Sequence, residues 1–373
     1  MHDQGMKRTQ FSIVAVGAAM AMTATVMTTA PAQSAPTTST GISQAAVSGV
    51  ASNAALGKRR TKVKAKASAR SVIALEKATV TGKVNGGKRQ VVLQLKNAYG
   101  WKKVDGDKTN KRGNYALKVP TKWYGKKKMR VLAPPTRRFR GDVNKVTVKV
   151  TEGYVPLGAN KSWTRLTNYK TRYNPCQTIK YAVNPSTLPA DGVAVLNAAI
   201  FRIELATGLR YKYSGTTKAI PFRTTSGRDE DKKANLSVAW STPETDASNL
   251  GGSVLARGGF TDAQWVPKRR TYKLTKTGLL MDASDVYAFR GFENGSSLGA
   301  VHMHELVHAA GLGHADNDPL QIMYPFANPE KPALFGNGDL TGLKQSGRDA
   351  GCLSRGNARV VAEGPELIPV NLP

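Results

Sequence analysis

Eleven residues near the C-terminal end of the chain, HELVHAAGLGH at positions 304–314, carry the side chains best suited to chemistry. His304 and His308 lie four residues apart, so a helix would project both from one face, with Cβ atoms about 6 Å apart. Gly311 can adopt the left-handed conformation that ends a helix, which would let the chain return His314 to the first two histidines. Three imidazoles that leave a fourth position open are the ligand set of a catalytic zinc ion.

The position of Glu305, next to the first histidine, suits it to accept a proton from a metal-bound water. A shorter H-E-x-x-H pattern arises by chance in roughly one chain in twenty of this length, and fixing Gly311 and His314 lowers that by about two orders of magnitude. The chain has only five histidines, and four of them fall between His302 and His314. His302 would point about 200° away from His304 around the helix, so we expect it at the surface or behind the ligands.

Met323 follows the histidines by nine residues, in the run IMYP at 322–325. A long histidine motif followed by such a methionine resembles the metzincin clan of zinc peptidases, and Met-Tyr-Pro resembles its matrixin family most closely. The resemblance implies that Met323 forms an apolar floor beneath the three imidazoles. It also implies that Tyr324 and Pro325 lead into the wall of the S1′ pocket.

The chain departs from that family in two respects. Vertebrate matrixins have an upstream cysteine that blocks zinc, whereas this chain has only Cys176 and Cys352. They also bind a structural zinc through upstream histidines, for which only His2 and His302 are candidates here. We therefore expect one catalytic Zn²⁺, and no residue pattern predicts a calcium site.

The N-terminal region has the features of an export signal. Residues 1–32 combine a basic start, an apolar run and a small-residue cleavage site, which predicts a signal peptide and not a transmembrane anchor. The Ala/Ser/Thr-rich residues 33–57 are expected to form a linker or pro-segment. Export permits disulfides, so Cys176 and Cys352 form one candidate pair, with two unrelated buried thiols as the alternative.

Charge separates the remaining chain into two parts. Residues 58–150 contain 28 lysines and arginines against 4 acidic residues, whereas residues 153–353 contain 23 against 17. Short alternating segments between turn signals predict a basic β-sandwich module over residues 58–152, which resembles immunoglobulin-like modules of exported enzymes. Its four central aromatic residues could stack on a ligand or fill the core: Tyr99, Trp101, Trp123 and Tyr124. Its charge would attract polyanions, and for an exported protein we favour anionic cell-wall polymer over nucleic acid.

The zinc motif belongs to a second predicted domain, residues 153–353, before a C-terminal tail at 354–373 that indicates no function. Its pattern predicts a strand at 179–183, a helix at 193–207, a glycine-rich edge strand at 250–260 and a last helix capped by Asp339. This order matches an α+β metzincin fold, with a twisted mixed sheet and three helices.

The sequence thus predicts a secreted zinc endopeptidase, either free or associated with the cell wall, that acts on proteins or peptides with Glu305 as general base. Two alternatives remain open at this stage. One is a zinc hydrolase of cell-wall peptide or amide bonds, and the other is a non-catalytic polyanion-binding envelope protein.

Overall fold

The computed structural model describes residues 58–222, 230–246, 250–284, 291–293, 297–326, 328, 330–354, 358–361 and 370–371. The predicted signal peptide and the 33–57 segment lie outside these residues. No described helix is long and apolar enough to cross a membrane.

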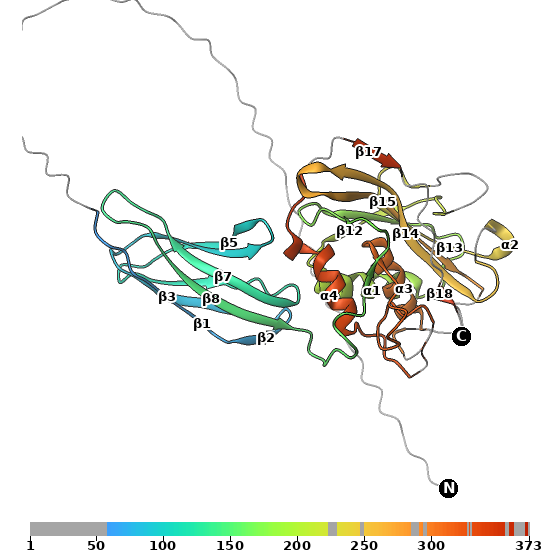
Figure 1. Ribbon diagram of the computed structural model, residues 1–373, viewed down its shortest axis with the longest axis horizontal. Coiled ribbons are helices and arrows are strands. Elements are labelled where there is room, and N and C mark those ends of the chain that lie inside the picture. The colour runs from blue at the N-terminus through green and yellow to red at the C-terminus, as the bar shows by residue number, and fades with distance from the viewer. Residues whose placement is uncertain are drawn as a thin grey trace, which may run out of the picture. The chain divides into compact units, whose positions relative to one another are not determined.

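The basic module consists of two sheets that share one apolar core (Figure 1). Alternation explains the packing: in the strand at Gln90–Asn97, Val91, Leu93 and Leu95 are buried while their neighbours are more exposed. The three-stranded sheet has the order β1-β3-β6, and the five-stranded sheet has the order β2-β8-β7-β4-β5. The strands are β1 (Val63–Ala67), β2 (Ser71–Ile73), β3 (Thr79–Val84), β4 (Gln90–Asn97), β5 (Gly100–Lys108), β6 (Asn114–Lys118), β7 (Gly125–Ala133) and β8 (Asp142–Thr151).

The aromatic residues of the module divide between packing and the surface. Trp123 is buried in the module core, and its indole nitrogen donates to Asp349 at 3.2 Å. Tyr124 packs against the core of the second domain, residues 153–353. Trp101 is half-buried beneath the guanidinium of Arg130. Packing therefore accounts for Trp123 and Tyr124, while the immunoglobulin-like assignment stays a prediction.

The second domain, which carries the histidine motif and is called the catalytic domain below, is α+β, with a mixed sheet in the order β12-β11-β13-β15-β14 and helices packed on one face. Neighbours from β12 to β15 run parallel, whereas β14 runs antiparallel to β15. The main elements are β11 (Ile179–Val183), α1 (Gly192–Thr207), β12 (Tyr211–Thr216), β13 (Leu236–Ser241), α2 (Pro243–Asp246), β14 (Val254–Val266), β15 (Thr271–Asp282), α3 (Leu298–Ala309) and α4 (Asn337–Ser346). Short strands complete it: β9 (Thr164–Arg165), β10 (Thr171–Arg172), β16 (Leu312–Gly313), β17 (Ala358–Val361) and β18 (Val370–Asn371).

The helix expected at 193–207 is α1, and Gly208 ends it with a positive φ of 70°. Its apolar face packs with α3 against the sheet, through Leu196, Ile203 and Leu306. The last helix begins at Asn337, so Asp339 lies inside its first turn and is not its N-cap.

The glycine-rich strand differs from the prediction for 250–260. The strand β14 begins at Val254 and continues to Val266, and it is not a free edge. On the side away from β15, the tail strand β18 pairs with Val254–Ala256 and β17 pairs with Asp262–Trp265. The tail residues were assigned no role from sequence because they carry no strong strand pattern.

Candidate metal centre

The helix α3 carries the first two histidines and is buried along nearly its whole length. Ser297 caps it by accepting a hydrogen bond from the backbone NH of Ala300 at 3.4 Å. The absence of a side chain at Gly258 lets β14 pass close to the helix, because a Cβ there would lie 2.6 Å from Oε2 of Glu305. The strand β14 and the helix α3 therefore meet at Glu305.

The turn after α3 brings in the third histidine, as predicted. Gly311 has a φ of 97°, and its NH donates to the carbonyl of His308 at 2.8 Å. A Cβ at Gly311 would lie 2.6 Å from the carbonyl oxygen of Thr171, so the position requires glycine on two grounds. The chain then forms β16, which pairs with β9, and reaches His314.

The three histidines gather their Nε2 atoms at one point. The distance from Nε2 of His304 is 3.0 Å to Nε2 of His308 and 3.1 Å to Nε2 of His314. Nitrogens bound to one tetrahedral zinc ion at 2.0–2.1 Å lie about 3.3 Å apart. All three side chains are buried, and together they form a group able to hold a metal ion.

Hydrogen bonds to carbonyls determine the tautomers of two of these rings. Nδ1 of His304 lies 2.7 Å from the carbonyl of Ile322, and Nδ1 of His308 lies 2.7 Å from that of Leu312. A carbonyl can only accept, so both Nδ1 atoms carry the hydrogen and both Nε2 atoms present lone pairs. Two lone pairs 3.0 Å apart repel each other unless a cation lies between them. The donor set therefore fits a divalent metal such as zinc.

Glu305 is fully buried beside this group, and neither carboxylate oxygen has a hydrogen-bond partner among the described residues. Burial raises the pKa of Glu305 well above its usual value, and the charge of Arg257 opposes that shift. A buried carboxyl group without a hydrogen-bond partner is suited to accept and release a proton.

Met323 lies in the core, 1% exposed, and its carbonyl accepts from Ala315 at 2.8 Å. The ring of Tyr324 is half-buried and contacts Phe326, at 5.8 Å between centroids. Pro325 follows in the same turn.

Asp339 supports this methionine turn, a role that the sequence did not reveal. Its carboxylate accepts hydrogen bonds from the backbone NH groups of Ile322 at 2.6 Å, Gly336 at 2.8 Å and Met323 at 3.2 Å. The carbonyl of Ile322 in turn accepts from His304. Asp339 is therefore connected to the first histidine through a single residue, although only its place near a helix start was visible in the sequence.

His302 does not join the group, and of the two positions expected for it the surface position is wrong. It is fully buried, with Nδ1 2.9 Å from the carbonyl of Leu298 and its ring 5.5 Å from that of Trp240. Burial lowers the pKa of His302 to about 4, so the ring is neutral at physiological pH. It packs behind the ligands as an apolar group.

A disulfide joins Cys176 to Cys352, with Cα atoms 5.4 Å apart. The bridge connects the segment before β11 to the segment after α4, and thereby encloses the elements that hold the histidines. The two cysteines are distant from the three histidines in sequence, and neither is a free thiol.

Comparison with known proteins agrees with this site. Residues 175–346 match the family model described as Matrixin, a peptidase family, and this match supports a matrixin-like metzincin assignment for the segment. The match includes the three histidines, Glu305 and Met323, and the family implies a hydrolase that uses zinc.

Other comparisons add little. No curated protein matches the chain. A solved structure of β-D-glucuronidase for Dictyoglomus thermophilum is 12% identical over 51% of this chain, with a TM-score of 0.16. The chain spans 40% of that structure's length, and a likeness this weak carries no argument.

Proposed function

We propose that this chain is a secreted zinc-dependent endopeptidase in which Glu305 acts as general base. The observation that carries the proposal is the set of three converging Nε2 atoms, with two of the Nδ1 atoms held by carbonyls. His304, His308 and His314 would hold the zinc ion. When bound, zinc supplies Lewis-acid chemistry, which polarises the scissile carbonyl and lowers the pKa of water.

Side chains of the protein would carry out the remaining steps of the reaction. Glu305 accepts a proton from the attacking water on one carboxylate oxygen and delivers it to the leaving amine. Its burial excludes bulk water and keeps the carboxyl group free of competing hydrogen bonds. Met323, buried in the domain core, supports the turn that supplies the carbonyl for His304.

The substrate is proposed to lie extended along β14 and to pair with its backbone. The favoured stretch is 257–261, because Gly258 lies against Glu305 and no described residue of the tail pairs with it there. Backbone pairing binds peptides with little regard to sequence, so side-chain selectivity would come from the Tyr324–Pro325 side of the cleft.

The test is the substitution Glu305→Gln, which removes the proton acceptor and retains the shape. We expect the variant to bind zinc with unchanged stoichiometry and to lose about 10²–10⁴-fold in the rate of casein cleavage. Glu244→Gln, at an exposed position of α2, is the matched control and should cleave at the parental rate. Casein cleavage by Glu305→Gln at the parental rate would overturn the mechanism.

The same assay separates the two alternative functions. Purified peptidoglycan is digested beside casein, with and without a chelator. Chelator-sensitive release from peptidoglycan alone identifies a zinc hydrolase of cell-wall bonds. Turnover of neither substrate, together with binding to envelope polymer, identifies a non-catalytic binding protein.

The basic module is proposed to tether the enzyme to anionic envelope polymer. Its net charge of +24 over residues 58–150 supports this, because release of counterions from a polyanion favours binding. Retention of the full chain on isolated envelopes should fall steeply as salt rises. Absent or salt-insensitive retention would contradict the tether.

A further inference from the structure

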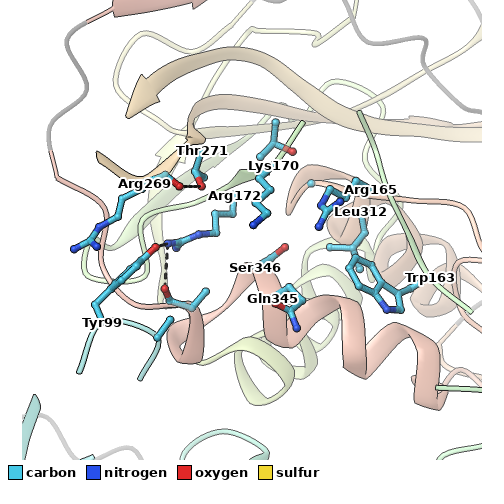
Figure 2. A pocket seen from close by; sticks show the side chains of 14 residues that line it. Tyr99, Trp163, Arg165, Lys170, Arg172, Arg269, Thr271, Leu312, Gln345 and Ser346 are labelled. Atoms are coloured by element: carbon cyan, nitrogen blue, oxygen red, sulfur yellow. Dashed lines mark hydrogen bonds between the residues drawn. The ribbon is translucent and has the colours of Figure 1, made fainter. Parts of the chain in front are cut away.

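A pocket of about 200 Å³ lies behind the turn that follows α3, apart from the three histidines (Figure 2). Its wall is formed by Gly311 and Leu312 of that turn, by Arg172 of β10 and by Ser346 at the end of α4. The pocket is therefore bounded by elements that hold the metal centre but contains none of its ligands.

The pocket is strongly cationic. Its lining includes Arg165, Lys170, Arg172 and Arg269, and none of the lining residues is acidic. Figure 2 shows the side chains of Lys170, Arg172 and Ser346 around one shared space. Arg165, Lys170 and Arg172 bring like charges to this space, and like charges repel, whereas the guanidinium of Arg269 is directed away from it over Tyr99.

Arg172 is the most firmly held cation of this pocket, because its side chain is only 5% exposed and has a defined position. Its Nη2 donates to the hydroxyl of Tyr99 and to the carbonyl of Ala350, both at 3.3 Å, and its Nη1 donates to the carbonyl of Tyr173 at 3.3 Å. All three acceptors are neutral. Burial lowers the pKa of Arg172, so the fold holds this charge at a cost that its neighbours do not offset.

The other cations are placed by short elements around it. Arg165 lies on β9 opposite Leu312, and Lys170 is held where its carbonyl accepts from Tyr272 at 2.8 Å. Arg269 stacks on the ring of Tyr99, with 3.4 Å from Cζ to the ring centroid. Tyr99 thus contacts both Arg172 and Arg269, which fixes two of the four cations relative to each other.

We propose that this pocket binds a phosphate group, either as free phosphate or as a phosphate ester in an anionic polymer. The guanidinium of Arg165 offers donors in a planar fork that matches two phosphate oxygens, and Lys170 adds a point charge. Arg172, whose Nη atoms already donate to Tyr99, Tyr173 and Ala350, adds a fixed positive charge. A phosphate carries up to two negative charges, which would offset the repulsion among these cations. The hydroxyl of Ser346 supplies a neutral donor in the same wall.

Binding of inorganic phosphate to the full chain, measured by calorimetry at constant ionic strength with chloride as the reference anion, tests this site. The double variant Arg165→Gln/Lys170→Gln removes the two exposed cations and leaves the buried Arg172 in place. We expect its phosphate affinity to fall about tenfold or more, as loss of charge-assisted hydrogen bonds predicts. The matched control Lys180→Gln/Lys212→Gln alters two exposed cations on β11 and β12 and should bind as the parent does.

A second arm uses poly(glycerol phosphate), an anionic polymer joined by phosphate esters, in place of inorganic phosphate. Weakened binding of both probes by the pocket variant supports a site that accepts free and esterified phosphate, and weakened binding of inorganic phosphate alone restricts it to the free ion. Equal affinity of parent and pocket variant for both probes overturns the proposal, because the module or the metal centre would then bind them. Failure of the parent to bind phosphate above the chloride reference overturns it as well.

Discussion

The basic module and the catalytic domain place their charges in opposite ways. In the module, a net charge of +24 over residues 58–150 lies mostly outside an apolar core such as Val80, Leu93 and Leu117. In the catalytic domain, the charges that matter are inside: Glu305 and Asp339 are fully buried. Exposed charge acts at long range and is screened by salt, whereas buried charge acts over a few ångströms on defined partners. The exposed charge of the module therefore suits attraction of polyanions, and the buried charge of the catalytic domain suits proton transfer and the positioning of other groups.

Lys127 is an exception within the module, as is Arg89, which is 6% exposed. Lys127 is fully buried, its ammonium donates to the carbonyl of Tyr124 at 2.8 Å, and it lies 3.9 Å from the ring centre of Trp123. Desolvation lowers its pKa to about 7, and Asp349 opposes that shift only in part. The contrast between the two regions can therefore be tested by substitutions on both sides of it.

The largest expected effect concerns the disulfide, which only the catalytic domain possesses. Replacing both cysteines with serine (Cys176→Ser/Cys352→Ser) should lower the free energy of unfolding by about 5 kcal/mol, because the bridge closes a loop of 176 residues in the unfolded chain. Urea denaturation followed by circular dichroism measures this. The parent protein kept in reductant should show the same loss, and a variant as stable as the oxidised parent would show that the bridge contributes nothing.

The next effect concerns Lys127. Its folded pKa of about 7 lies below the usual lysine value of 10.5, so the protonated form favours the unfolded chain. Stability of the parent should therefore rise as pH increases from about 7 towards 10.5, and Lys127→Met should lose this slope. At pH 7 the variant should be more stable by up to about 4 kcal/mol.

Urea midpoints measured between pH 7 and pH 10 check that expectation. Lys128→Met, at the exposed neighbouring position of β7, should keep the parental slope and change stability by less than about 0.5 kcal/mol. A Lys127→Met protein with the parental pH dependence would show that Lys127 does not titrate in this range.

The convergence of the three histidines could be predicted because their signal is local. His304, His308, Gly311 and His314 lie within eleven residues, and helix geometry and one left-handed glycine determine how they meet. The helix α1 was equally visible, since its apolar residues recur at helical spacing up to Gly208. The mixed sheet followed from the order of these elements and from the family resemblance.

Other features depend on contacts between distant residues. The strand β5 is polar and largely exposed, so no alternation marked it, and only its pairing with β4 makes it a strand. The burial of His302 depends on Trp240, which lies 62 positions earlier in the chain. The tail strands β17 and β18 are defined by β14 and not by their own residues. Local patterns cannot report such partners.

Asp339 gives the smallest and most selective test of the comparison, because its buried charge acts on the metal centre only through Ile322. In Asp339→Asn, one of the two acceptor oxygens becomes an amide NH2, which cannot accept a hydrogen bond, so the side chain can no longer accept from the NH groups of Ile322, Met323 and Gly336 at once. The carbonyl of Ile322 should then hold His304 less firmly. We expect zinc affinity to fall about 10–100-fold, as for other groups that orient a metal ligand.

Competition with a chromophoric chelator measures that affinity, and circular dichroism confirms that the variant is folded. Asp191→Asn is the matched control, since Asp191 precedes α1 and its side chain makes no capping hydrogen bond. A folded Asp339→Asn protein with parental zinc affinity would show that the carboxylate supports only the methionine turn. Reduced affinity with intact folding would instead show that one buried charge, 35 residues from His304 in sequence, positions the metal centre.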